Sequence, residues 1–143
     1  DVFSYFGLGC RNISKLFVPT GYDFNTLLKT WEPFNPVIHH HKYCNNYDYQ
    51  KAIIMINKEV FTDSGFLLLT ETDKLVSPIA VLFFEQYTSN EDLTVKIESV
   101  KDKLQCIVGN HPLSTTGFGQ AQSPEVWDYA DKVDTLKFLG ELG

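Results

Sequence analysis

A cysteine in a glycine-rich turn is the residue of this sequence best suited to covalent chemistry. Cys10 lies within Gly-Leu-Gly-Cys-Arg-Asn, residues 7–12, beside Arg11, the single arginine of the chain. Thiolate is the attacking form of cysteine, and a neighbouring guanidinium with converging backbone N–H groups favours that form. We therefore predict that Cys10 is a nucleophile. The neighbours expected to activate it or to stabilise an oxyanion are Gly9, Arg11 and Asn12.

The same hexapeptide also has interpretations that need no catalysis. A buried strand from Phe3 to Phe6 followed by a Gly-x-Gly turn would make it an ordinary loop. Arg11 would then be a surface salt-bridge partner, and Asn12 would satisfy the turn. A dinucleotide-binding loop is disfavoured, because Asn12 replaces the third glycine of that fingerprint and no clearly amphipathic helix follows.

Two further segments carry residues with chemical potential. The stretch 109–123 is rich in glycine and hydroxyl groups and reads as a long loop, in which His111 is an acid–base candidate. The residues predicted to line an acyl or nicotinamide pocket, unless they form a plain connecting turn, are Gly117, Phe118, Gly119 and Gln120. The run 39–41 of three histidines predicts no metal site, because consecutive rings on extended backbone point to opposite sides.

Composition and charge exclude several classes of protein. A chain of 143 residues with 43% hydrophobic content is sufficient for a single domain, residues 1–143, with its own core. The net charge of -6 and the scattered lysines argue against a nucleic-acid surface. Apolar runs such as 53–56 and 79–84 are too short to span a membrane. Three widely spaced cysteines do not form a disulfide framework, so we expect a cytoplasmic protein.

Hydrophobic periodicity and turn residues predict an α/β fold that positions these candidates. Strands are expected at 13–18, 66–69, 79–84, 105–108 and 133–139. Helices are expected at 23–31, 46–58 and 89–104, with a short helix after the Ser-Pro pair at 123–124. The helix that begins at Ser89 would connect strands 79–84 and 105–108 as a right-handed βαβ crossover. Cys10 would then lie at the entrance of the first strand.

Three motifs together resemble bacterial acyl-CoA reductases, the family that includes the fatty-acid reductase of bacterial luminescence. They are Gly-Leu-Gly-Cys-Arg-Asn-Ile-Ser-Lys-Leu-Phe-Val-Pro (7–19), His-Lys-Tyr-Cys-Asn-Asn-Tyr-Asp-Tyr (41–49) and Gly-Phe-Gly-Gln-Ala-Gln (117–122). The chain also resembles the catalytic half of aldehyde dehydrogenases, in which a basic residue follows the nucleophilic cysteine by five positions, as Lys15 follows Cys10. The resemblance implies a three-layer fold with a parallel or mixed sheet flanked by helices.

The implied reaction is the reduction of a long-chain fatty acyl-CoA, or an acyl-protein thioester, to an aldehyde by NADPH through a thioester on Cys10. Because the chain opens at Asp1 without a methionine, we expect the C-terminal catalytic part of a longer enzyme, inactive alone. NADPH would be bound mainly by an upstream domain, and no metal is implied. Lys74 stands where the superfamily commonly has a glutamate that contacts the cofactor ribose.

Two alternatives belong to other classes of function. In the first, the segment is a non-catalytic assembly domain, and the strand expected at 133–139 joins subunits into a homo-oligomer, as the last strand does in the aldehyde dehydrogenase fold. In the second, the protein is a cysteine acyltransferase or thioesterase, which would need a histidine paired with Cys10 and no hydride donor.

Overall fold

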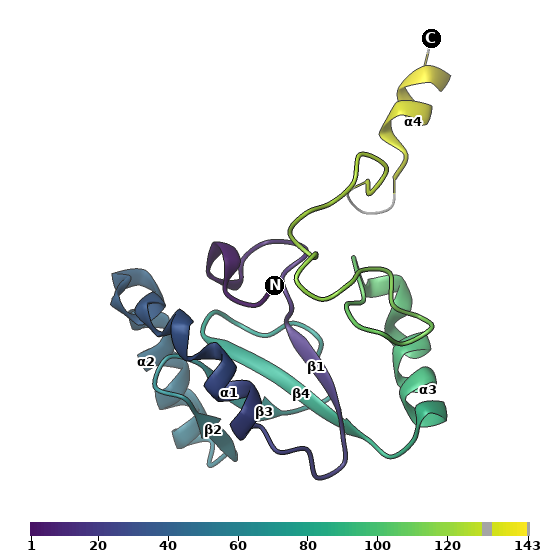
Figure 1. Cartoon of the computed structure of the whole chain (residues 1–143). Coiled ribbons are helices and arrows are strands. Elements are labelled where there is room, and N and C mark those ends of the chain that lie inside the picture. Colours follow the sequence, from purple (N-terminus) through teal and green to yellow (C-terminus); the bar gives the residue numbers. More distant parts are fainter. Residues whose placement is uncertain (130–132, 143) are drawn as a thin grey trace.

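A four-stranded mixed sheet flanked by helices forms the body of this α/β protein (Figure 1). The computed structural model describes residues 1–129 and 133–142. In spatial order the strands are β1 (Lys15–Pro19), β4 (Val81–Tyr87), β3 (Leu68–Glu71) and β2 (Phe61–Asp63). Strand β4 is central and pairs in parallel with both β1 and β3, whereas β2 is antiparallel to β3.

Helices precede, separate and follow the strands. The α-helices are α1 (Asn25–Trp31), α2 (His41–Ile56), α3 (Asn90–Val100) and α4 (Thr135–Glu141). The 3-10 segments are η1 (Ser4–Gly7), η2 (Glu32–His39) and η3 (Lys101–Lys103). None of the helices in the described ranges is long and apolar enough to cross a membrane.

Both faces of the sheet are buried, because successive strand residues point to opposite sides. One face packs against α2, and its cluster contains Tyr43, Tyr47, Ile54, Leu68, Val81 and Phe83. The opposite face packs against α1, and its cluster contains Phe24, Leu28, Trp31, Leu69, Leu82 and Phe84. The predicted strands at 66–69 and 79–84 are thus confirmed as buried strands, each beginning two residues later than its apolar run.

Helix α3 begins where the sequence predicts. The Ser89 hydroxyl accepts a hydrogen bond from the Asp92 N–H at 3.2 Å, which caps the first turn. Leu93 and Ile97 are buried. Lys96 forms an ion pair with Glu85 of β4 at 2.6 Å, which fastens the helix to the sheet.

The crossover predicted from α3 to a strand at 105–108 is wrong. After η3, the only β contact of that stretch within the described residues is an isolated bridge between Val108 and Thr116. Strands β1 and β3 already occupy both edges of β4, so no position beside it remains for a further strand. Cys106 is accordingly half-buried in a loop rather than inside a sheet.

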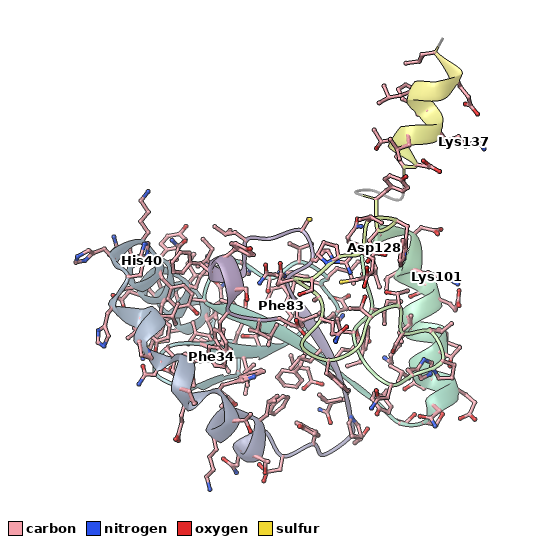
Figure 2. The ribbon with its side chains drawn as sticks, turned by 45° about the horizontal axis from the view of Figure 1, so that its top comes forward. Phe34, His40, Phe83, Lys101, Asp128 and Lys137 are labelled. Atoms are coloured by element: carbon pink, nitrogen blue, oxygen red, sulfur yellow. The ribbon has the colours of Figure 1, made fainter. Side chains whose placement is uncertain are left out.

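The predictions for the last twenty residues are also wrong. No helix begins at Pro124; residues 124–129 form turns, one of them closed by a hydrogen bond from the Glu125 N–H to the Asp128 carboxylate at 3.1 Å. The strand expected at 133–139 is helix α4, whose N-terminus is capped by Asp134 on the Lys137 N–H. A helix satisfies its backbone locally, whereas a strand needs a neighbour. Figures 1 and 2 show α4, with Lys137, apart from the sheet.

Three predictions for the N-terminal half need correction as well. Helix α2 starts at His41 instead of residue 46, because burial of Tyr43 and its hydrogen bond to the Phe66 carbonyl draw the first turn into the helix. The histidine run is therefore not one extended segment: His39 ends η2, His41 begins α2, and only His40 between them has extended backbone. The strand considered for Phe3 to Phe6 is the 3-10 turn η1.

Candidate active site

Cys10 lies at the tip of a tight turn that leads into β1. The Asn12 N–H donates to the Gly9 carbonyl at 2.9 Å, and the Gly9 N–H donates to Asn12 Oδ1 at 2.8 Å. These two bonds close a ring around Cys10 and Arg11, the two central residues of the turn. The Cys10 side chain is exposed, whereas the Arg11 side chain is only 11% exposed. The turn therefore presents the thiol to solvent and directs the guanidinium inward.

Arg11 connects the turn to the C-terminal loop. Its Nε donates to the Ala121 carbonyl at 2.7 Å, and its guanidinium lies 3.6 Å from the Asp128 carboxylate. Its charge also acts on Cys106: burial raises the pKa of the Cys106 thiol, and the guanidinium opposes that rise only in part. Arg11 thus has the salt-bridge partner that the structural interpretation expects, but in a half-buried rather than a surface position.

Asn12 satisfies the backbone on both sides of the turn. Its Nδ2 donates to the carbonyls of Asp1, Val2 and Ser4 at 3.2, 3.2 and 2.7 Å. Its Oδ1 also accepts from Gln122 Nε2 at 3.3 Å. The carboxamide therefore faces protein groups, which supports the structural interpretation of this residue.

Position 9 has no room for a side chain, because the carboxamide of Asn12 lies close to the Gly9 backbone. A Cβ at position 9 would lie 2.4 Å from Asn12 Oδ1, well inside van der Waals contact. Asn12 cannot move aside freely, since its carboxamide is held from several directions. The missing side chain of Gly9 thus makes room for the protein's own amide.

The loop Gly117–Gln120 lies beside the N-terminal segment. The Asp1 carboxylate accepts from the Gly119 N–H at 2.6 Å and from the Ala121 N–H at 3.0 Å. The Phe118 ring is 70% exposed, and none of the four loop residues lines either of the two cavities described below. The fold brings this loop near the Cys10 turn, but the acyl or nicotinamide pocket remains a prediction.

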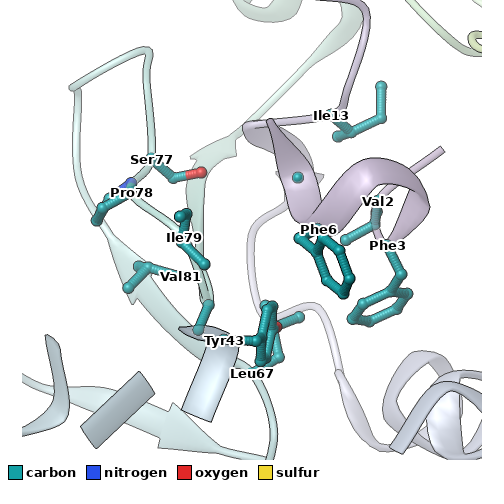
Figure 3. Close-up of a pocket in the computed structure, with 12 residues that line it drawn as sticks. Val2, Phe3, Phe6, Ile13, Tyr43, Leu67, Ser77, Pro78, Ile79 and Val81 are labelled. Atoms are coloured by element: carbon teal, nitrogen blue, oxygen red, sulfur yellow. The ribbon is translucent and has the colours of Figure 1, made fainter. Parts of the chain in front are cut away.

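The two cavities differ in size and in their relation to the turn. The one in Figure 3 lies under η1, is lined by apolar side chains such as Phe3, Phe6 and Ile79, and has a volume of about 20 Å³, which holds one water. The other has about 330 Å³ and includes Arg11. Its further lining residues, which sequence reasoning missed, are Gln105, Thr115, Thr116, Trp127, Asp128, Tyr129 and Asp134. The sequence feature that could have indicated this cavity is an aspartate between two aromatic residues, Trp127-Asp128-Tyr129.

The histidines occupy other surroundings. His111 Nδ1 accepts from the Leu113 N–H at 3.2 Å, and its Nε2 lies 3.4 Å from Thr94 Oγ1, so this ring is engaged by its own loop and by α3. The His40 ring packs on Phe6 with centroids 4.4 Å apart. Within residues 1–129 and 133–142, no group of three His, Cys, Asp or Glu side chains is arranged to hold a metal ion.

Comparison with known proteins adds no relative. No family model, no curated protein and no solved structure matches the chain. What is established is the class of fold, a four-stranded mixed α/β sheet flanked by helices. Its most distinctive chemical feature is an exposed cysteine on a braced turn before the edge strand β1.

Proposed function

We propose that this chain is the acyl-transfer part of an acyl-CoA reductase, with Cys10 as the residue that takes the acyl group. The observation that carries the proposal is the exposed thiol at the tip of the Gly9–Asn12 turn. Among the described residues, no acceptor takes up the N–H of Cys10, so a donor lies on the same residue as the sulfur. The resemblance of the motif at 7–19 to acyl-CoA reductases implies the substrate class, a fatty acyl thioester.

The proposed acyl transfer exchanges one thioester for another. The Cys10 thiolate attacks the carbonyl carbon of the acyl-CoA, a new C–S bond forms, and the carbonyl oxygen becomes an oxyanion. The Cys10 N–H donates a hydrogen bond to that oxyanion. The oxyanion then collapses, the bond to the CoA sulfur breaks, and CoA leaves as a thiolate that takes up a proton from solvent. The thioester bond to CoA that is broken and the thioester bond to Cys10 that is formed have similar energies.

Reduction of the acyl group needs a hydride donor, and NADPH is the donor that the resemblance implies. The described residues do not fit a dinucleotide site: the turn at 7–12 runs into strand β1 and not into a helix N-terminus, where a pyrophosphate would bind. We therefore propose that NADPH binds outside these residues, and we derive no reduction step from them.

Covalent capture can be measured directly with radiolabelled myristoyl-CoA. The wild-type chain and Cys44→Ala should retain label after denaturation and gel filtration, and Cys10→Ala should retain none. Cys44, on α2, is the matched control because it is partly accessible and belongs to a different part of the molecule. Label that persists in Cys10→Ala would contradict the proposal.

The relative reactivity of the three thiols gives a second measurement. With iodoacetamide on the folded protein, Cys10 should alkylate faster than Cys44 and Cys106, because Cys10 alone is exposed and burial raises the pKa of Cys106. Peptide mapping by mass spectrometry reads the three rates. Equal rates would remove the accessibility argument for Cys10.

Assembly is a second candidate function, and α4 favours it. Four apolar side chains in and next to this helix are exposed: Leu136, Phe138, Leu139 and Leu142. We propose that they contact a second copy of the chain, so that light scattering should give the mass of a dimer. The double variant Leu136→Ser/Leu139→Ser should be monomeric, with the exposed Val95→Ser on α3 as the control. A monomeric wild-type chain would exclude this contact.

A further inference from the structure

We infer that Asn12 is a positioning residue for acyl transfer at Cys10, an inference that rests on the proposed function. A carboxamide has two donor hydrogens and two acceptor lone pairs. In Asn12 the acceptor oxygen holds the Gly9 N–H and Gln122 Nε2, while Nδ2 donates to three backbone carbonyls. No capacity is left for a substrate, so Asn12 acts through the turn that it closes.

Asn12 closes the turn around Cys10 with both its side chain and its backbone N–H. Its Oδ1 takes up the Gly9 N–H at 2.8 Å, and its own N–H closes the turn on the Gly9 carbonyl. The N–H groups of Cys10 and Arg11 are both left without an acceptor among the described residues, and that of Cys10 is on the residue that carries the sulfur. By holding the turn closed, the amide keeps the backbone of Cys10, and with it the donor beside the nucleophile, in one conformation.

The same amide also joins three segments that are distant in sequence. Its Nδ2 holds residues 1–4, its Oδ1 reaches Gln122, and the Asp1 carboxylate binds the loop through Gly119. Loss of the Asn12 side chain would release the contacts to residues 1–4 and to Gln122 and would leave the bond between Asp1 and Gly119 in place. We expect the main consequence at Cys10, because that residue lies at the tip of the turn and its side chain is exposed.

Two reactions of the Cys10 sulfur distinguish a role of Asn12 in positioning the turn from simple exposure of the thiol. Acyl transfer from myristoyl-CoA develops an oxyanion and needs the oriented N–H, whereas alkylation by iodoacetamide needs only an accessible thiolate. In Asn12→Ala, the ratio of acylation rate to alkylation rate at Cys10 should fall on the order of 10- to 100-fold. Asn46→Ala is the matched control, since its Nδ2 also donates to a backbone carbonyl, that of Lys42, and its ratio should not change.

Each outcome decides the inference. A wild-type ratio in Asn12→Ala would overturn the positioning role and leave the proposed acyl transfer standing. Absence of acylation in the wild-type protein would overturn both. Should Asn12→Ala fail to fold, Gln122→Ala decides: it removes only the 3.3 Å bond to Oδ1, and a fall in the ratio of about two- to tenfold, the equivalent of one hydrogen bond, is expected. An unchanged ratio there would overturn the inference.

Discussion

The central sheet and the Cys10 turn are stabilised by different physical means. In β3 and β4, Leu68, Leu69 and Leu82 have at most 1% of their surface exposed, and hydrophobic burial holds them. In the turn, the carboxamide of Asn12 and the guanidinium of Arg11 bind backbone groups one by one. Burial is non-directional, so a sheet tolerates small shifts, whereas a turn built from single hydrogen bonds loses its geometry when one atom is removed.

The two regions also differ in the reach of their contacts. The pairing of β1 with β4, as in Lys15 with Phe83, spans 68 residues, whereas the Arg11 bond to Ala121 spans 110 residues and the Asp1 bond to Gly119 spans 118. Contacts between distant segments cost more loop entropy to form. The turn should therefore be the less stable region, and the predictions below test this difference from the largest effect to the smallest.

A substitution that creates a cavity in the sheet should have the largest effect on the free energy of unfolding. Leu68 is completely buried, so Leu68→Ala should lower the free energy of unfolding by about 2–5 kcal/mol. Urea denaturation followed by circular dichroism measures it, with the exposed Val60→Ala expected to stay within about 0.5 kcal/mol of wild type. A small loss for Leu68→Ala would mean that burial in the sheet is not the main source of stability.

Overpacking the turn should come next. In Gly9→Ala the new Cβ meets Asn12 Oδ1 at 2.4 Å, and we expect a loss of about 1–3 kcal/mol by the same denaturation measurement. Gly140→Ala in α4 is the control, because a Cβ there meets nothing within 4 Å. If the two alanine variants are equally stable, the turn is more tolerant than its hydrogen bonds indicate.

Loss of a single polar contact next to the sheet, the side-chain cap of α3, should lower the free energy of unfolding by less. Ser89→Ala removes the side-chain cap of α3 and should lower the free energy of unfolding by about 1 kcal/mol. Ser99→Ala, whose hydroxyl donates to the Lys96 carbonyl within the same helix, should change stability less. A loss for Ser89→Ala as large as that for Leu68→Ala would contradict hydrophobic burial as the main source of stability in the sheet region.

The smallest expected effect is on how the stability of the protein depends on acidic pH. Burial raises the pKa of Glu85, but hydrogen bonds from Lys15 and Lys96 outweigh it and hold the pKa below its ordinary value of 4.5. A lowered folded-state pKa contributes stability above pH 4.5, and this contribution is lost as the pH falls through the folded-state pKa. Thermal melts between pH 6 and 3 should therefore show a smaller acid-induced decrease for Glu85→Gln than for wild type. An identical decrease in both proteins would assign the acid sensitivity to other carboxylates.

The local patterns of the sequence were sufficient for much of the sheet. Alternation before β1, the apolar runs of β3 and β4 and the Ser89 cap each depend on residues a few positions apart, and the structure has these elements within two residues of the predicted starts. The strand predicted at 133–139 failed because apolar content alone does not distinguish a strand from a helix; the Asp134 cap does.

What the sequence determined by itself is the strands β1, β3 and β4, the start of α3, and the presence of a cysteine between a glycine and the single arginine. Tertiary structure alone decided that Cys10 faces outward, that Arg11 turns inward to Ala121 and Asp128, and that the Asn12 amide is occupied. Periodicity reports which face of an element is buried, and it is a local property. Hydrogen-bond partners more than a hundred residues away depend on how the chain closes on itself, which no local pattern encodes.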